Sequence, residues 1–185
     1  MGAAKLLLPW GDGTVIAAVI AAWRRSAVRE VLAVVSADDA ALTTVCRTAG
    51  ATVVVPPVPP AEMKDSLQAA IAHAELLCER GPAFDCFLVA PADMPWLESE
   101  TIDRLLAVFA ESPAEIIVPT HASRRGHPIV VPWSLAAEVM TLAGNESLKT
   151  IVERHSVRTV ECDATVLGDL DTPEEYQAAR ERFKK

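Results

Sequence analysis

Short apolar runs rich in β-branched residues alternate along the chain with longer segments whose apolar residues recur at helical spacing. Residues 31–35 read Val-Leu-Ala-Val-Val and are apolar on both faces, as expected of a strand that helices cover on each side. This alternation is typical of βαβ units and predicts an α/β fold, a three-layer sandwich with a mostly parallel, Rossmann-like sheet. The strands are expected at residues 31–35, 52–55, 86–90, 115–118, 128–131 and 157–161.

The helices between these strands begin and end at recognisable signals. The last one has the clearest start, because Thr172 can cap it, Pro173 suits the first helical position and Glu175 stands where a capping box places its carboxylate. The helices are expected at residues 14–25, 39–48, 65–80, 100–110, 134–142, 147–154 and 174–183. The alternation continues on both sides of the proline-rich residues 56–60, so we interpret residues 1–185 as one domain.

Composition and charge exclude several classes of protein. A net charge of −8 argues against nucleic-acid binding, which usually needs a basic face. Charges interrupt every apolar stretch before the roughly 18 residues that would suggest a membrane span, and no signal peptide is visible. The four cysteines show no CxxC spacing and are interpreted as reduced thiols. We therefore expect a cytoplasmic protein.

The strongest candidate for chemistry is Asp93, which follows an apolar strand directly and is stiffened by Pro95. Ligands of open α/β sheets collect at the carboxyl ends of the strands, where a carboxylate can hold Mg²⁺ beside a phosphate. The alternative is an ordinary turn or capping aspartate. A second carboxylate, Asp171, lies just before the last helix and could equally be part of its start. If both loops reach the same edge, Asp93 and Asp171 can share one Mg²⁺.

Basic residues elsewhere in the chain could meet the phosphates. Lys5 stands beside an apolar stretch, where it could neutralise charge on a phosphoryl group in transit, or simply extend its ammonium group to solvent. Arg125 could bind an anionic substrate, and Gly126 would permit close backbone approach to a ligand. His127 is assigned no acid or base role.

Five stretches together resemble the molybdenum cofactor cytidylyltransferases, a branch of the nucleotide-diphospho-sugar transferase fold. They are residues 1–10, 63–67, 91–95, 125–128 and 169–175, and they span nearly the whole chain. The resemblance implies an Mg²⁺-dependent nucleotidyltransferase that moves CMP from CTP to the terminal phosphate of molybdopterin or molybdenum cofactor and releases pyrophosphate. It also implies CTP and a phosphorylated pterin as ligands, and a molybdoenzyme or its accessory protein as a protein partner.

The resemblance assigns a role to each matching residue. Lys5 would contact the nucleotide phosphates and stabilise the transition state, and Asp93 and Asp171 would ligate Mg²⁺. Ser66 lies in a segment similar to the family's base- and ribose-contacting loop and would help to hold the nucleotide. The second substrate would lie beside Arg125, Gly126 and His127.

Two departures from the family pattern set further expectations. The family begins with a strand and a glycine-rich loop that ends in Met-Gly, and only Met1 and Gly2 match it here. We therefore expect an N-terminally truncated domain whose real start lies about 20 codons upstream. In the resembled fold the absent strand lies between residues 31–35 and 86–90, so a gap or an abnormal pairing is expected there. Ser147 and Lys149 stand where relatives more often have glycine and arginine.

Three alternatives stay open on the sequence alone. The domain could be a catalytically impaired or non-catalytic accessory domain that binds a cofactor. It could be an enzyme that uses GTP in place of CTP. A sugar phosphate or an isoprenoid phosphate could also be the acceptor.

Overall fold

The computed structural model describes residues 3–182, so the expected remnant Met1–Gly2 and the predicted last helical residue, Phe183, lie outside the described residues. The α-helices are α1 (Val15–Arg25), α2 (Ala40–Thr48), α3 (Met63–Glu79), α4 (Ser99–Glu111), α5 (Ala136–Met140), α6 (Leu148–Arg154) and α7 (Pro173–Arg182). The strands are β1 (Pro9–Trp10), β2 (Gly13–Thr14), β3 (Leu32–Val34), β4 (Thr52–Val54), β5 (Cys86–Val89), β6 (Ile116–His121), β7 (Arg124–Arg125), β8 (Ile129–Pro132) and β9 (Val157–Glu161). Short 3₁₀ helices cover Ala3–Leu7, Trp133–Leu135 and Ala164–Val166.

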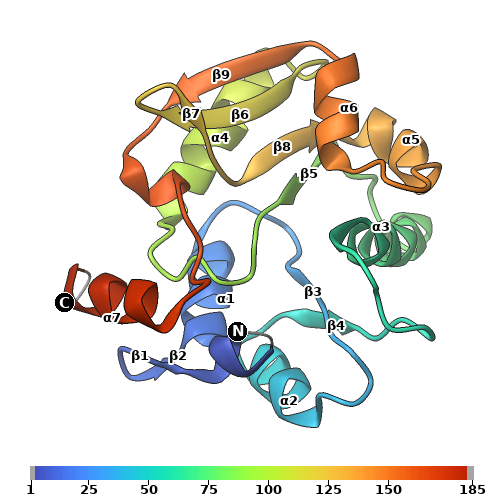
Figure 1. Ribbon diagram of the computed structural model, residues 1–185. Helices are drawn as coiled ribbons and strands as arrows, with labels where there is room; N and C mark the ends of the chain where they lie inside the picture. Colours follow the sequence, from blue (N-terminus) through green and yellow to red (C-terminus); the bar gives the residue numbers. More distant parts are fainter. Residues whose placement is uncertain (1–2, 183–185) are drawn as a thin grey trace.

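The largest sheet has β6 at its centre (Figure 1). β6 pairs with β9 in parallel on one side and with β8 in antiparallel fashion on the other, and β5 pairs antiparallel to β8. The strands β5, β6 and β9 thus run in one direction, and β8 is the reversed strand between β5 and β6. A second sheet consists of the parallel pair β3 and β4, and β1 and β2 form a small hairpin.

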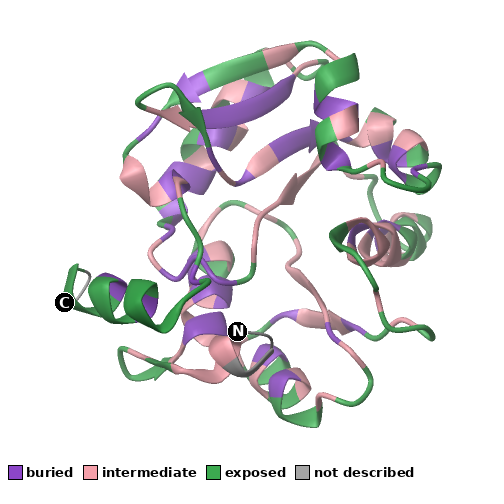
Figure 2. Cartoon of the chain, viewed as in Figure 1, coloured by how far each residue is buried: buried purple, intermediate pink, exposed green. Residues whose placement is uncertain are grey.

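Helices cover both faces of the larger sheet because its strands alternate their apolar side chains. Ile116 and Val118 of β6 pack with α3, α5 and α6, whereas Ile117 between them packs with α4. All three side chains are at most 1% exposed. Figure 2 shows this burial along β6 and β8, with the outer strand β9 largely exposed. The expected three-layer α/β class is confirmed, with β8 as the exception to the expected parallel direction.

The expected elements agree with the observed ones except where a turn redirects the chain. β6 runs three residues beyond the expected end because it continues into a hairpin with β7, which turns at Ala122 and Ser123 with φ of 48° and 66°. The expected helix at residues 134–142 is instead a 3₁₀ turn followed by the short α5. Within the described residues, no helix is long and apolar enough to cross a membrane.

β3 and β5 face each other across a cavity. In residues 3–182 no ladder joins these two strands, so the expected gap between them is present. The cavity has a volume of about 590 Å³, and β3, β5, Leu6, Ser66 and Ala70 contribute to its lining. Open space, not a ladder, therefore lies between β3 and β5 in the described part of the chain.

Gly126 is required by the close approach of two backbone segments. Its N–H donates to the Pro119 carbonyl at 2.8 Å, and the next N–H, that of His127, donates to the Val166 carbonyl at 2.8 Å. A Cβ atom at position 126 would overlap the carbonyl oxygen of Val166. The approach that the sequence predicted for a ligand is here made by the chain's own backbone.

Filling the cavity should stabilise the protein. Ala70→Leu places added methylene groups into existing space, so we expect the free energy of unfolding in urea to rise by about 1–2 kcal/mol. The matched control is Ala22→Leu in α1, where the alanine is 2% exposed and does not line the cavity. Overpacking there should lower stability by about 1–3 kcal/mol. Equal losses in the two variants would show that the cavity is closed in solution.

Gly126→Ala should be strongly destabilising, because the new methyl group meets a backbone atom that no rotamer change can move. We expect a loss of about 3 kcal/mol, measured by thermal or urea unfolding. Gly81→Ala is the control, since a Cβ there comes no nearer than 3.6 Å to the Leu77 carbonyl. The control should remain within about 1 kcal/mol of the wild type. A Gly126→Ala variant as stable as this control would contradict the backbone contact.

Candidate active site

The ammonium group of Lys5 lies between two carboxylates at the carboxyl end of β5. Its Nζ atom is 2.5 Å from Asp93 Oδ2 and 3.0 Å from Asp171 Oδ1, and 166 positions separate Lys5 from Asp171 in the sequence. Burial alone would lower the pKa of Lys5, but hydrogen bonds and charge attraction from Asp93 and Asp171 outweigh it and raise the pKa above its ordinary value. The structure therefore brings together three residues that the sequence singled out.

Asp93 is held in place by the apolar residues that follow it. Met94 is 1% exposed and Leu97 is 3% exposed, and both pack with Ile102 of α4. The Leu97 N–H donates to the Met94 carbonyl at 3.1 Å, which closes a turn directly after Asp93. This anchoring leaves the Asp93 side chain only 8% exposed, at the end of the segment that leaves β5. A carboxylate buried to this degree requires a cationic partner.

Asp171 is positioned by the start of α7. The Thr172 hydroxyl accepts from the Glu175 N–H at 3.1 Å, and the Glu175 carboxylate accepts from the Thr172 N–H at 2.8 Å, so the expected capping box is present. The same carboxylate also accepts from the N–H of Asp171 at 3.0 Å. Leu170, 1% exposed, anchors the preceding residue in the core. The helix cap thus fixes the backbone that carries Asp171.

Lys5 reaches the site because the N-terminal segment packs against α7. Val15, Leu170 and Tyr176 form a small core to which Leu6, Leu8, Trp10 and Trp96 add partly buried side chains. The Tyr176 hydroxyl donates to the Pro9 carbonyl at 2.5 Å. Figure 1 shows the β1–β2 hairpin beside α7, at the same end of the molecule. Apolar packing between the first and last segments therefore places Lys5 opposite Asp171.

Asp169 is a further carboxylate of the cluster that the sequence reasoning did not select. Ligand oxygens of Asp93, Asp169 and Asp171 all lie within 4.8 Å of one another. Burial, followed by repulsion from Asp171 and Asp93, raises the pKa of Asp169. A signal was available in the sequence, because Asp169 and Asp171 flank one apolar residue, Leu170, whose burial turns both aspartates outward.

The donor atoms of this cluster suit a hard divalent cation. Three carboxylates converge, and oxygen ligands of this kind are those that Mg²⁺ and Mn²⁺ prefer. The presence of a lysine ammonium between two of them shows that the position attracts positive charge. Asp93, Asp169 and Asp171 are the described residues that could hold such an ion.

The other predicted site residues occupy different parts of the fold. Ser66 is in the first turn of α3 and lines the cavity together with residues 90–92, which lead to Asp93. The Nδ1 atom of His127 is 3.3 Å from the Val89 carbonyl, at the end of β5, and burial lowers the pKa of His127 while Asp169 opposes this. Arg125 is exposed in β7. Of these residues, His127 contacts the end of β5, the strand that precedes Asp93 in the chain.

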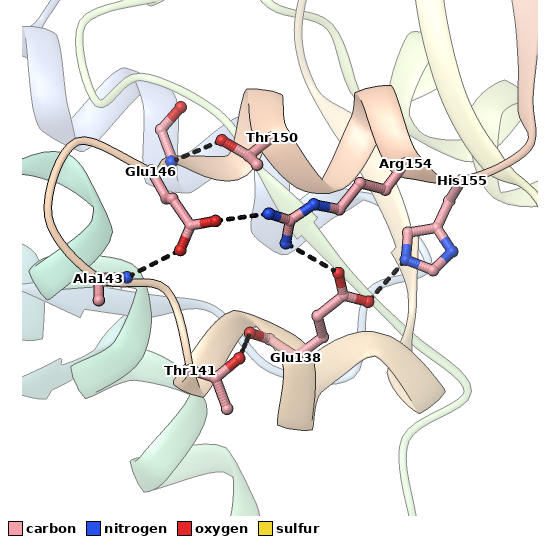
Figure 3. Close-up of polar contacts among 8 residues, drawn as sticks. Glu138, Thr141, Ala143, Glu146, Thr150, Arg154 and His155 are labelled. Carbon is pink, nitrogen blue, oxygen red and sulfur yellow. Dashed lines mark hydrogen bonds and ion pairs between the residues drawn. The ribbon is translucent and has the colours of Figure 1, made fainter.

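Charged side chains bridge the loop before α6 (Figure 3). Glu146 accepts from the Ala143 N–H at 3.2 Å and pairs with Arg154 at 2.5 Å. Glu138 contacts the same guanidinium at 3.5 Å and His155 Nε2 at 2.6 Å. Ser147 caps α6 through a reciprocal bond with Thr150.

Lys149, the second departure from the family pattern, lies on the surface of α6. It is 3.7 Å from Glu153 in an exposed i,i+4 pair. The polar loop network thus accounts for Ser147 through its capping role, and Lys149 has only a surface ion pair.

Several solved structures of other proteins are similar to this chain. Rv0371c from Mycobacterium tuberculosis H37Rv superposes on this chain with a TM-score of 0.80 at 27% identity, covering 98% of this chain and 91% of that one. A complex of Rv0371c with manganese gives a TM-score of 0.76 at 27% identity, with coverage of 96% and 91%. A cytidylyltransferase from Leptospira borgpetersenii shares the fold, with a TM-score of 0.75, 17% identity and coverage of 95% and 78%. No curated protein matches the sequence.

A family model described as the MobA-like NTP transferase domain matches residues 1–160, which is most of the 185-residue chain. The fold, the convergent lysine and aspartates and the similar structures agree with this match. The family-level resemblance seen in the sequence is thereby confirmed: the chain belongs to the MobA-like NTP transferase domain family and is a nucleotidyltransferase.

Proposed function

We propose that residues 1–185 form a single catalytic domain that transfers CMP from CTP to the terminal phosphate of molybdopterin or molybdenum cofactor. The observation that carries this proposal is the convergence of Lys5 with Asp93, Asp169 and Asp171 at the carboxyl end of β5. A phosphoryl-transfer reaction needs positive charge beside the phosphates. A carboxylate cluster that binds a cation and a neighbouring lysine together supply that charge.

The proposed reaction asks for positioning and charge neutralisation, and no protein nucleophile is required. A terminal phosphate oxygen of the acceptor attacks the α-phosphorus of CTP, the bond to the bridging oxygen breaks, and pyrophosphate leaves with the electron pair. Lys5 would bind the phosphates and neutralise the charge that develops on them. Asp93 and Asp171, assisted by Asp169, would hold a divalent cation that supplies Lewis acidity when bound.

We assign Mg²⁺ as the cation because Mg²⁺ binds through one or two carboxylates together with substrate phosphates. The manganese complex of Rv0371c supports a divalent ion in a protein of similar structure. The choice of CTP rests on the resemblance of residues 5–10 to the cytidylyltransferase branch. The cytidylyltransferase of Leptospira borgpetersenii supports only the fold, at 17% identity.

The other predicted residues keep their proposed roles. Ser66 would contact the nucleotide, and its place on the cavity that extends to residues 90–92 supports this. Arg125, Gly126 and His127 would lie on the side of the pterin substrate, and the contact of His127 with the end of β5 supports that side. A molybdoenzyme or its accessory protein would receive the product.

A cytoplasmic location is also part of the proposal. The four cysteines, Cys46, Cys78, Cys86 and Cys162, are all free thiols. Burial raises the pKa of Cys86 to about 11, which keeps this thiol protonated and unreactive near neutral pH. Unpaired thiols of this kind suit a reducing compartment.

Asp93→Asn should abolish turnover while the domain stays folded. The amide keeps the shape of the side chain but removes its charge, so we expect pyrophosphate release from CTP with molybdopterin to fall at least about a hundredfold. Asp38→Asn, in an exposed position, is the control with the same change of net charge and should keep full activity. Circular dichroism would verify the fold of both variants.

The same assay separates the alternatives. Undiminished activity in Asp93→Asn would remove this carboxylate from the mechanism. Preference for GTP would replace the nucleotide assignment only, and turnover with a sugar phosphate but not with the pterin would replace the acceptor. Wild-type protein that binds nucleotide and cation without turnover would favour the accessory-domain alternative.

A further inference from the structure

We infer that Lys5 is a displaceable cation that occupies the carboxylate site when the metal is absent and moves to the nucleotide phosphates when the metal binds. Lys5 would therefore oppose binding of a divalent cation alone and favour binding of the cation together with a nucleoside triphosphate. This inference rests on the proposed function because it concerns the same site, but it adds a coupling between the binding of the two ligands.

The distances show that the ammonium and a metal ion need the same oxygens. Lys5 Nζ is 2.5 Å from Asp93 and 3.0 Å from Asp171, and these carboxylates lie within 4.8 Å of each other and of Asp169. An Mg²⁺ ion would bind the same oxygens at about 2.0–2.1 Å. Two cations held by one pair of carboxylates repel each other strongly, because their separation is only a few ångströms.

The two candidate partners of Lys5 differ in burial, which explains why the ammonium is needed in the metal-free state. The Asp93 side chain is 8% exposed, whereas that of Asp171 is 67% exposed. Solvent can stabilise the charge of Asp171, but the charge of Asp93 depends on a cation within the protein. Lys5 supplies that cation until a metal ion takes its place.

The side chain of Lys5 can make this move. It is partly exposed, at 17%, and it projects from a short 3₁₀ helix on a flexible four-carbon stem. Once a metal ion neutralises Asp93, the ammonium loses its main partner and is free to pair with phosphate oxygens. The change of partner couples metal binding to nucleotide binding through a movement of the Lys5 side chain.

The test compares Mn²⁺ affinity of the full chain with and without CTP, by calorimetry or electron paramagnetic resonance. Lys5→Met keeps the length of the side chain and removes its charge. Without CTP, this variant should bind Mn²⁺ about tenfold more tightly than the wild type, because the competing ammonium is gone. With CTP present, it should bind Mn²⁺ at least about tenfold more weakly, because the lysine–phosphate contact is lost.

Two control variants make the result specific. Lys149→Met, on the exposed surface of α6, removes the same charge and should leave both affinities within about twofold of the wild type. Lys5→Arg keeps the competing charge and should not show the tighter binding of Mn²⁺ alone. If Lys5→Met is unstable, Mn²⁺ should raise its melting temperature more than that of the wild type, since the ion replaces the missing partner of Asp93.

The outcomes distinguish this inference from the proposed function. Equal Mn²⁺ affinities in wild type and Lys5→Met without CTP would overturn the competition, even if both proteins bind the ion well. Weaker binding in Lys5→Met under both conditions would assign Lys5 a purely supporting role and would also overturn it. Failure of wild-type protein to bind Mn²⁺ with or without CTP would instead refute the cation site of the proposed function, and this inference with it.

Discussion

A buried carboxylate needs a cation beside it, and the organisation of this domain follows from that requirement at Asp93. The side chain is 8% exposed, and Lys5 is 2.5 Å away. An isolated buried charge would be highly unfavourable, so the structure must bring the beginning of the chain to the end of β5. The nucleotidyltransferase site is thus also a structural contact between the segment that carries Lys5 and the loop that follows β5.

Apolar packing and a helix cap hold the N-terminal segment and Asp171 in position at this site. Leu6, Leu8 and Tyr176 pack around Leu170 and place the N-terminal segment against α7. The Glu175 carboxylate binds the backbone N–H groups of Asp171 and Thr172 and fixes the second carboxylate. Neither the apolar packing nor the helix cap takes part in the reaction, but each determines where a reacting phosphate would meet positive charge. A fault in the α7 cap would therefore affect the site before it affected the core.

A cavity lies next to this site. The cavity between β3 and β5 is lined by residues of both strands, by Leu6 of the N-terminal segment and by Ser66 of α3. Beyond the cavity, α4 covers one face of the larger sheet while α3, α5 and α6 cover the other. The structure thus joins the larger sheet, β5 to β9, to a smaller unit of β3, β4, α1 and α2 across this cavity.

Local signals in the sequence determined the α/β class, most helix and strand positions and the α7 capping box, because each depends on residues a few positions apart. They also identified Lys5, Asp93 and Asp171 as candidates, although each had an ordinary alternative explanation. Only the tertiary structure decided that these three meet, since 166 positions separate Lys5 from Asp171 and contacts between distant segments close that distance. The reversed direction of β8 and the place of Asp169 in the cluster likewise depend on contacts between distant segments, which no local pattern encodes.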